Sequence, residues 1–415
     1  MDFFVEEADP HGDITPPSCK SFSQRHVLLA SLGHGKTTIR NVSGSDDEIV
    51  SIRMAEKMNT EVSYSREEVA ISGEFREPGI INAGSSATSY RLCVGMLAGK
   101  SAAADFTGTA ELSARPIAPL LTSLNTMGCD VTLKDDGFVK LVGARIATGP
   151  VTIESSISSQ FLSSLIIAST VAEKHFPIIV NGELSSPGYV EITKNCLAEY
   201  GISVSVSEKT VNVTGELENK HRTIDVEADF SSAAFFIVLG LLKSTEGLRI
   251  RGLKRKSLQP DSSILEILGD YLEITGPGGE KIDVVCRKSP LKKIVVDAAK
   301  NPDLAPPLSV VGIFSDPGVE IKNVERLRFK ESDRFSSIVS LCEMFGAKVS
   351  MDRGNLRIKR GRMNKNQKKI DFHDHRMIMA AAVAASANGG GCWISNREMA
   401  GKSYPMFFEH LAAVQ

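Results

Sequence analysis

An arginine stands where an apolar helix is predicted to begin, near the C-terminus. The chain reads His373, Asp374, His375 and Arg376 before the apolar run 377–387. The first N–H groups of a helix have no partner inside it and the helix dipole is positive there, so such a place binds anions. More cations occur in regions far apart in sequence, namely Lys20 with Ser21 and Arg25, Arg115, Lys330, Arg334 and Lys402. A site that recruits them would hold a small molecule with several negative charges.

Two segments rich in small polar residues precede apolar helical runs. Their members are Asn82 and Gly84 in the segment 82–86, and Ser158, Ser159 and Gln160 in the second. Glycine permits close approach of a ligand to the backbone, while the hydroxyls either cap a helix or donate to an oxyanion. Capping explains each segment alone, but their matching places in front of helices favour convergence on one site.

The segment 328–334 carries a lysine, a carboxylate and an arginine close together. Lys330 and Arg334 are four residues apart, so both are predicted on one helical face, with Glu331 beside them. This arrangement suits either a ligand site or an ion-pair ladder on the surface.

Four further candidates have ordinary structural explanations as well. Arg115 precedes a proline at a predicted helix start, where a solvated arginine is common. Asp303 could cap the helix expected from residue 304 onward. His373 and His375 lack the companion spacing of a metal site, so no metal is predicted.

Composition bounds the class of protein. The chain has 415 residues, 42% of them hydrophobic, which predicts two domains with separate cores. Lys and Arg total 48 against 50 Asp and Glu, and this balance argues against nucleic acid as partner. Seven scattered cysteines indicate thiols in a reducing compartment. The N-terminal residues lack the pattern of a signal peptide and no apolar run reaches membrane-spanning length, so we expect a cytoplasmic protein without a membrane partner.

A phrase of a Gly-containing turn and a short strand recurs about every 70 residues. Its copies are 33–41, 176–182, 245–252, 316–323 and 389–396, with a weaker sixth at 98–108. Between them recurs an amphipathic helix stopped by glycine and followed by alternating strand residues, at 120–133, 195–206 and 340–351. The pattern predicts an α/β protein of two similar domains with three units each. The boundary is expected near 225–229, and return of the N-terminal segment to the second half would make a double-crossover hinge.

Residues 30–37 fit a relaxed phosphate-binding P-loop pattern. A P-loop runs from strand through loop into helix, whereas here a helix is predicted before the loop and a strand after it. A plain turn of the repeat is therefore the favoured interpretation.

Nine short motifs, in order along the chain, resemble the 5-enolpyruvylshikimate-3-phosphate synthase family. They are 19–21 with Arg25, 82–86, 113–117, 158–161, 186–193, 301–303, 328–334, 374–377 and 401–405. The resemblance implies an inside-out barrel of the enolpyruvyl transferase type, with three βαβαββ units in each domain. It places the first domain at 18–227, on the shikimate 3-phosphate side, and the second at 1–17 plus 228–415.

The resemblance also implies a reaction: transfer of the enolpyruvyl group of phosphoenolpyruvate to the 5-hydroxyl of shikimate 3-phosphate, with release of phosphate. No cofactor is needed, and we expect a monomer. Carried over by motif, shikimate 3-phosphate is held by Lys20, Ser21, Arg25, Ser158, Ser159, Gln160, Ser186, Tyr189, Asp303 and Lys330. Phosphoenolpyruvate is held by Lys20, Asn82, Gly84, Arg115, Gln160, Arg334, Arg376 and Lys402. The implied catalytic residues are Asp303, Glu331 and Lys20.

Two departures from the family pattern stand out. Ser18 and Cys19 precede Lys20 where the family has Gly-Ser, and Thr88 occupies a position that commonly holds arginine. Arg91 lies about one helical turn later and is a candidate substitute.

Two other functions are compatible with parts of this pattern. UDP-N-acetylglucosamine enolpyruvyl transferase shares the fold and donor, but it has Lys-Asn at the first motif and a loop cysteine, whereas Cys129 here follows a glycine of the repeat. A catalytically silent protein that binds phosphorylated metabolites is the alternative of a different class. The presence of Lys20, Asp303 and Glu331 argues against it.

Overall fold

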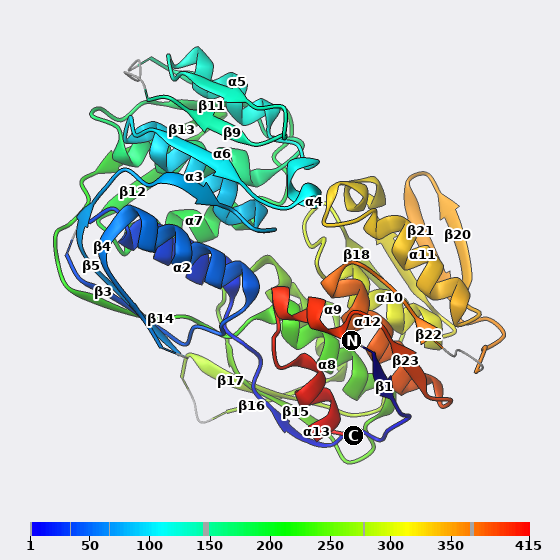
Figure 1. The fold of residues 1–415 in the computed structure, drawn as a ribbon. Coiled ribbons are helices and arrows are strands. Elements are labelled where there is room, and N and C mark those ends of the chain that lie inside the picture. The colour runs from blue at the N-terminus through cyan, green and yellow to red at the C-terminus, as the bar shows by residue number, and fades with distance from the viewer. Residues whose placement is uncertain (1, 34, 66, 144–148, 277–278, 366–368) are drawn as a thin grey trace. The chain divides into compact units, whose positions relative to one another are not determined.

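The chain folds into two compact units, one of residues 18–226 and one of residues 1–17 and 227–415. The computed structural model describes residues 2–33, 35–65, 67–143, 149–276, 279–365 and 369–415. The backbone passes from one unit to the other after Pro17 and again after Val226. The N-terminal strands belong to the second of these units, where β1 (Phe3–Val5) pairs with β23 (Cys392–Ile394) and β2 (Gly12–Ile14) with β15 (Leu248–Lys254) (Figure 1).

Within its described residues, unit 18–226 has three four-stranded sheets. Their strand orders are β14 (Arg222–Asp225), β3 (Thr37–Arg40), β5 (Glu68–Phe75), β4 (Asn59–Tyr64); β6 (Gly79–Asn82), β7 (Ala104–Thr107), β9 (Val139–Leu141), β8 (Val131–Leu133); and β10 (Val151–Glu154), β11 (Ile178–Asn181), β13 (Thr210–Gly215), β12 (Ile202–Ser207). In each sheet the first two strands are parallel and the other pairs are antiparallel. The helices are α1 (Lys20–Ala30), α2 (Asp46–Met58), α3 (Ala87–Gly99), α4 (Ala110–Ser113), α5 (Ala118–Thr126), α6 (Ser159–Val171) and α7 (Gly188–Ala198).

The second unit repeats the plan in the part of the chain that is described. Its sheets are β2, β15, β17 (Lys281–Cys286), β16 (Leu272–Thr275); β18 (Ile294–Asp297), β19 (Val319–Lys322), β21 (Asn355–Lys359), β20 (Lys348–Asp352); and β22 (Lys369–Ile370), β23, β1. Each again combines one parallel pair with antiparallel pairs. Its helices are α8 (Phe230–Lys243), η1 (Pro260–Ser263), α9 (Ile264–Ile267), η2 (Gly269–Tyr271), α10 (Ala305–Phe314), η3 (Val324–Phe329), α11 (Arg334–Met344), α12 (His375–Asn388), η4 (Arg397–Lys402) and α13 (Phe407–Ala413). The predicted α/β fold with three repeats in each half is confirmed.

The recurring turn-and-strand phrase is the second strand of each sheet, and in three of its six copies it ends in an asparagine. Asn41, Asn323 and Asn396 have φ of 64°, 55° and 57°, in the left-handed region that asparagine tolerates. The amide of Asn323 donates to Asp297 Oδ1 over 2.7 Å, at the end of the neighbouring parallel strand. That of Asn396 donates in the same way to Asp371 Oδ1, over 2.6 Å. The repeated asparagine therefore ties the exits of two parallel strands together.

Each unit has helices that are buried on nearly every side. In unit 18–226 they are α1, α3 and α6, and in the other they are α8, α10 and α12. Much of their surface is apolar or small-sided, as in the run of alanines from Ala380 to Ala382 in α12, although α1 also buries polar side chains such as Arg25. The helix predicted over 377–387 is confirmed as part of α12, and α3 and α6 are the apolar helices predicted after the two small polar segments.

The loop at 30–37 runs from helix α1 into strand β3, which is opposite to the order of a P-loop. Residue 34 of that motif lies outside the described residues.

The glycine-stopped helices also occur as predicted, since Gly128, Gly201 and Gly346 follow α5, α7 and α11 with positive φ.

Two glycines let α3 and α6 approach closely. A Cβ on Gly95 would lie 2.2 Å from Oγ and 2.4 Å from the carbonyl oxygen of Ser164. One turn later, a Cβ on Gly99 would lie 2.4 Å from the carbonyl oxygen of Ala168. Backbones at this spacing allow side chains from the first turn of α6 to reach α3.

We predict that Gly95→Ala destabilises the protein, although alanine is the better helix former. The added methyl group meets the backbone of α6, so overpacking should lower the free energy of unfolding by about 1–3 kcal/mol. Denaturant unfolding measures it. Gly149→Ala is the matched control. A Cβ at Gly149 would have no neighbouring atom within 4 Å, and the φ of Gly149 lies outside the left-handed region. A Gly95→Ala protein as stable as the control would contradict the close approach.

Candidate active site

Arg25 is a buried cation whose hydrogen bonds go to neutral acceptors. It lies in α1 with 1% of its surface exposed. Nε donates to Thr193 Oγ1 over 2.8 Å, Nη1 to the Ser21 carbonyl over 2.7 Å and Nη2 to the Tyr189 carbonyl over 3.3 Å. Burial lowers the pKa of Arg25, and burial followed by the charge of Arg25 lowers the pKa of the neighbouring His26 to about 3. A guanidinium held in this way favours the approach of an anion.

Lys20, at the start of α1, pairs with a carboxylate that sequence reasoning missed. Its Nζ lies 2.6 Å from Oδ2 of Asp47 in the first turn of α2. The adjacent Glu48 accepts from Ser18 and Ser23, and it closes a capping box with Ser45. The Ser-x-x-Glu pattern at 45–48 could have predicted this helix start. The partnership with Lys20 has no such signal, because it joins two helices.

The start of α6 brings together Gln160 and residues of α3. Ser158 caps the helix, since its Oγ accepts from the N–H of Gln160 over 3.3 Å. The Gln160 amide accepts at Oε1 from Arg91 Nη1 over 2.7 Å and donates from Nε2 to Thr88 Oγ1 over 2.9 Å. Capping and contact with other candidate residues therefore occur together at this helix start. Ser159, the first residue of α6, is buried.

Ser186 and Tyr189 precede and open α7, on the same side as Arg25. Ser186 has φ of 48°, which is strained for a serine, and its carbonyl accepts from the N–H of Tyr189 over 3.2 Å. Because the Tyr189 carbonyl accepts from Arg25, the backbone of this turn is tied to α1. Ser21, Arg25 and Tyr189 are therefore connected directly in the structure.

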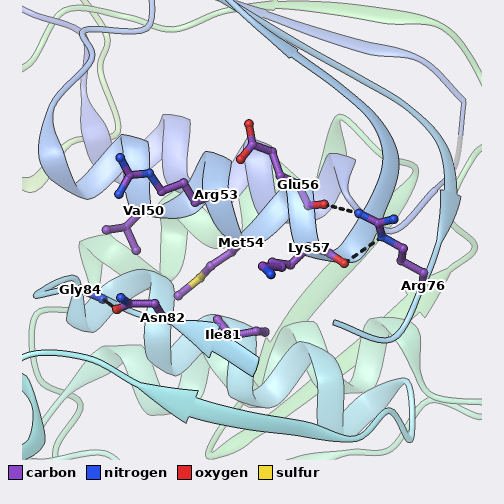
Figure 2. A pocket seen from close by; sticks show the side chains of 9 residues that line it. All are labelled: Val50, Arg53, Met54, Glu56, Lys57, Arg76, Ile81, Asn82 and Gly84. Atoms are coloured by element: carbon purple, nitrogen blue, oxygen red, sulfur yellow. Dashed lines mark hydrogen bonds between the residues drawn. The ribbon is translucent and has the colours of Figure 1, made fainter. Parts of the chain in front are cut away.

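Asn82 and Gly84 line a cavity of about 490 Å³ between α2 and β6. Asn82 Oδ1 accepts from the N–H of Gly84 over 2.8 Å, and a Cβ on Gly84 would lie 2.9 Å from Val50 Cγ2. Figure 2 shows these two residues at one end of the cavity and Arg76 at the other, where it donates to the carbonyls of Glu56 and Lys57. Arg76 therefore serves as a cap for the end of α2.

Arg115 lies between α4 and α5, before the proline that precedes α5. Arg91 Nη2 donates to the carbonyl of that Pro116. The segment that carries Arg115 is thus tied to the same guanidinium that holds Gln160.

In the other unit, Arg334 is a fully buried cation among three carboxylates. Nη1 lies 2.8 Å from Asp303 Oδ1, Nη2 lies 2.5 Å from Glu331 Oε2 and Nε lies 3.0 Å from Asp374 Oδ2. Burial lowers the pKa of Arg334, but the three carboxylates, with Asp374 the strongest, raise it above the ordinary value. Three of the predicted residues are thereby brought together with Asp374, the N-cap of α12.

Arg376 joins this cluster through Asp303, whose Oδ2 lies 3.0 Å from Arg376 Nη2. Burial raises the pKa of Asp303, but Arg376 and then Arg334 outweigh it, so the pKa lies below its usual range. The backbone N–H of Arg376 donates to Asp374 Oδ1 over 2.9 Å, so the expected anion position at this helix start is filled by the N-cap carboxylate. Nη1 of Arg376 is buried and, among the described residues, has no hydrogen-bond partner. A buried donor without a partner is costly, which makes Nη1 of Arg376 a candidate contact for an anionic ligand.

Asp261 is a further buried carboxyl beside this cluster, and sequence reasoning missed it. Burial first, and then the charge of Asp303, raise the pKa of Asp261 to about 7, while Arg376 opposes the shift. The hydroxyl of Ser231, in the first turn of α8, donates to the carboxylate of Asp261.

Two structural expectations for the segments near Asp303 are wrong. Lys330 and Arg334 do not share a helix, because Lys330 follows η3 while Arg334 begins α11. Asp333 between them caps α11, with Oδ1 accepting from Ser336 N–H over 3.1 Å, so the turn changes direction there. Asp303 does not cap α10, whose N-cap is Leu304, since its carboxylate is drawn to the two arginines.

The two remaining predicted cations, Lys330 and Lys402, belong to the unit of residues 1–17 and 227–415. Lys330 acts on Asp303, where its charge helps to lower the pKa of Asp303 after burial, Arg376 and Arg334. Lys402 ends η4, which packs against α12.

His373 and His375 form no metal cluster, and none occurs among the described residues. Nor does the described part of the chain contain a helix long and apolar enough to cross a membrane.

The comparisons with known proteins agree on one family. Residues 6–411 match the family model of EPSP synthase (3-phosphoshikimate 1-carboxyvinyltransferase). The 3-phosphoshikimate 1-carboxyvinyltransferase of Thermoplasma volcanium is 39% identical over 397 residues, which cover 95% of this chain and 94% of that protein.

Solved structures agree on the fold. EPSP synthase from Acinetobacter baumannii has a TM-score of 0.80 at 23% identity, covering 100% of this chain and 98% of that one. An enolpyruvyl transferase from Streptomyces tendae has a TM-score of 0.78 at 17% identity, covering 99% and 96%. At these identities the likeness establishes the fold alone, but the sequence match spans nearly the whole chain. The chain therefore belongs to the EPSP synthase (3-phosphoshikimate 1-carboxyvinyltransferase) family.

Proposed function

We propose that this chain transfers the enolpyruvyl group of phosphoenolpyruvate to the 5-hydroxyl of shikimate 3-phosphate and releases phosphate. The observation that carries the proposal is the cluster around Arg334, in which two carboxylates, Asp303 and Glu331, are held by one buried guanidinium. Beside it, Arg376 keeps a buried donor for a ligand. Paired carboxylates and fixed cations are what this reaction needs.

Shikimate 3-phosphate is assigned to the cation and hydroxyl groups gathered on α1, α6 and α7. The residues proposed to hold it are Lys20, Ser21, Arg25, Ser158, Ser159, Gln160, Ser186 and Tyr189, with Asp303 and Lys330. Arg25 supports the assignment most directly, because its neutral partners leave its charge for a phosphate. Domain 18–227 thus supplies most of the groups for this substrate.

Phosphoenolpyruvate is assigned to the remaining cations and to a backbone position. The residues proposed to hold it are Lys20, Asn82, Gly84, Arg115, Gln160, Arg334, Arg376 and Lys402. Gly84 leaves its backbone accessible, with φ of 52°. The carboxylates that transfer protons belong to the domain of residues 1–17 and 228–415.

The chemistry proceeds through a tetrahedral ketal. The 5-hydroxyl oxygen bonds to C2 of phosphoenolpyruvate as that hydroxyl loses its proton and C3 gains one. A proton then leaves the new methyl group, the C2–C3 double bond re-forms and the C2–O bond to phosphate breaks. Asp303 and Glu331 are proposed to move these protons, with Lys20 in contact with the charged groups.

We propose that binding of an anionic ligand changes the pKa of Asp303. In the free protein Arg376 and Arg334 outweigh burial and hold the pKa of Asp303 low, which makes its carboxylate a weak base. When an anionic ligand engages Arg376, its negative charge offsets that of the guanidinium. The pKa of Asp303 then rises toward a value suited to a general base.

The UDP-N-acetylglucosamine reaction is disfavoured by Cys129. Its thiol is 5% exposed and packs in the core, and burial raises its pKa to about 11. A cysteine in such surroundings is a poor nucleophile or acid. We further propose that the reaction needs no cofactor, because proton transfer and fixed charges suffice for the steps above. The protein is also proposed to be a cytoplasmic monomer that acts on small molecules.

Phosphate release tests the proposal. Shikimate 3-phosphate with phosphoenolpyruvate should give rapid release, whereas UDP-N-acetylglucosamine with phosphoenolpyruvate, or ATP alone, should not. Release only with the UDP-sugar would establish the rival reaction. Tight binding of shikimate 3-phosphate without turnover would establish the silent binder.

We predict that Asp303→Asn and Glu331→Gln lower kcat about 10²–10⁴-fold, the usual contribution of general acid–base groups. Both amides keep the shape of the carboxylate, so KM should change less than kcat. Steady-state kinetics with circular dichroism as a check on folding measure this. Near-normal kcat in both variants would show that other groups move the protons.

The pH dependence should report the tuning of Asp303. We expect the acidic limb of kcat, set by the bound state, to lie at higher pH than that of kcat/KM, set by the free protein, after correction for ionisation of the substrates. The reason is the rise in the pKa of Asp303 when a ligand engages Arg376. Coincident limbs, or a kcat limb at lower pH, would contradict it. Arg376→Lys provides a comparison, since a lysine cannot hold Asp303 and the ligand in the same fork.

A further inference from the structure

The amide of Gln160 is engaged at both ends. Its oxygen accepts from Arg91 Nη1 over 2.7 Å, and its nitrogen donates to Thr88 Oγ1 over 2.9 Å. A flipped amide would set its NH₂ against the guanidinium, donor against donor. One orientation is thereby selected, and it leaves the second N–H of Gln160 for another acceptor.

Arg91 is itself held rigidly. It is 4% exposed, its guanidinium lies 5.0 Å from the centre of the Phe161 ring, and Nη2 donates to the Pro116 carbonyl. Its own carbonyl accepts from Ser164 Oγ over 2.6 Å, at the point where Gly95 lets α3 and α6 approach. These contacts fix the position of the guanidinium, so Arg91 is suited to hold other residues in place.

Thr88 holds the other end of the Gln160 amide. It lies one turn before Arg91 on α3, half-buried, and its hydroxyl accepts from the Gln160 amide nitrogen. A threonine can accept here, whereas a cation could not. Thr88 and Arg91 together therefore match the two ends of one amide.

We propose that Thr88 and Arg91 are positioning residues that fix the orientation of the Gln160 amide, and that Arg91 also fixes the segment carrying Arg115. The proposal rests on the proposed function, in which Gln160 contacts both substrates and Arg115 contacts phosphoenolpyruvate. It assigns Thr88 a role of its own at a position where a ligand-binding arginine is otherwise expected. Phosphoenolpyruvate, contacted by both Gln160 and Arg115, should be more sensitive to these residues than shikimate 3-phosphate.

The kinetic test compares Thr88→Val in two backgrounds. Loss of one neutral hydrogen bond should raise KM for phosphoenolpyruvate about 3–10-fold. In a Gln160→Ala background the same substitution should change KM less than about twofold, because the amide it positions is gone. Thr126→Val is the matched control: Thr126 is exposed on α5 and donates to a carbonyl within its own helix, so its kinetics should equal those of the wild type.

Arg91→Lys probes the other end of the amide. Lysine keeps the charge but cannot hold the Gln160 oxygen and the Pro116 carbonyl in one planar fork. We expect KM for phosphoenolpyruvate to rise about tenfold or more, with a smaller change for shikimate 3-phosphate. Equal changes for both substrates, or none, would overturn the role of Arg91.

The outcomes separate this inference from the proposed function. If wild-type protein is active and Thr88→Val acts equally with and without Gln160, the positioning role is wrong while the function stands. If the wild type lacks activity, the function is wrong, and the contact is judged from denaturant midpoints of Thr88→Val, Gln160→Ala and the double variant. Non-additive midpoint shifts support the contact and additive shifts overturn it.

Discussion

The compensation of one buried guanidinium is the constraint on which the unit of residues 1–17 and 227–415 depends. An unpaired charge in the interior is costly, and removal of one partner of a buried pair costs several kcal/mol, typically about 3–5. Arg334 meets the requirement with carboxylates from three places: before α10, before α11 and at the start of α12. The same three contacts therefore hold together the segments that precede α10, α11 and α12, and only Asp374 also caps its helix.

The other unit places a cation in its interior by the opposite means. Arg25 is surrounded by a hydroxyl and two carbonyls, which satisfy its donors without cancelling its charge. The carboxylates around Arg334 balance its positive charge, whereas the neutral acceptors around Arg25 leave its positive charge uncompensated. Two buried arginines thus acquire different chemistry from their acceptors alone.

Much of the architecture could be predicted from the chain because it repeats. Asn41, Asn323 and Asn396 each mark the same left-handed exit from a strand, and local patterns of this kind are readable without coordinates. The order of the motifs also indicated a set of candidate site residues, which includes Arg334, Arg376, Asp303 and Glu331. What sequence reasoning missed are partners from other elements, such as Asp47 beside Lys20 and Asp374 beside Arg334. The shared helical face expected for Lys330 and Arg334 failed because Asp333 starts a new helix between them. Spacing along a chain carries no information on such packing.

The pairing of the N-terminal strands has a consequence for the order in which the chain assembles during synthesis. β1 pairs with residues 392–394 and β2 with residues 248–250. Residues 18–226 bury their own core and can fold as they emerge from the ribosome. β2 lacks its partner until residues 248–250 have been made, and β1 lacks its partner until residues 392–394 have been made, so both strand edges stay open in the meantime. The sheet of β22, β23 and β1 is therefore the last to be completed, and it joins residues 3–5 to residues 392–394.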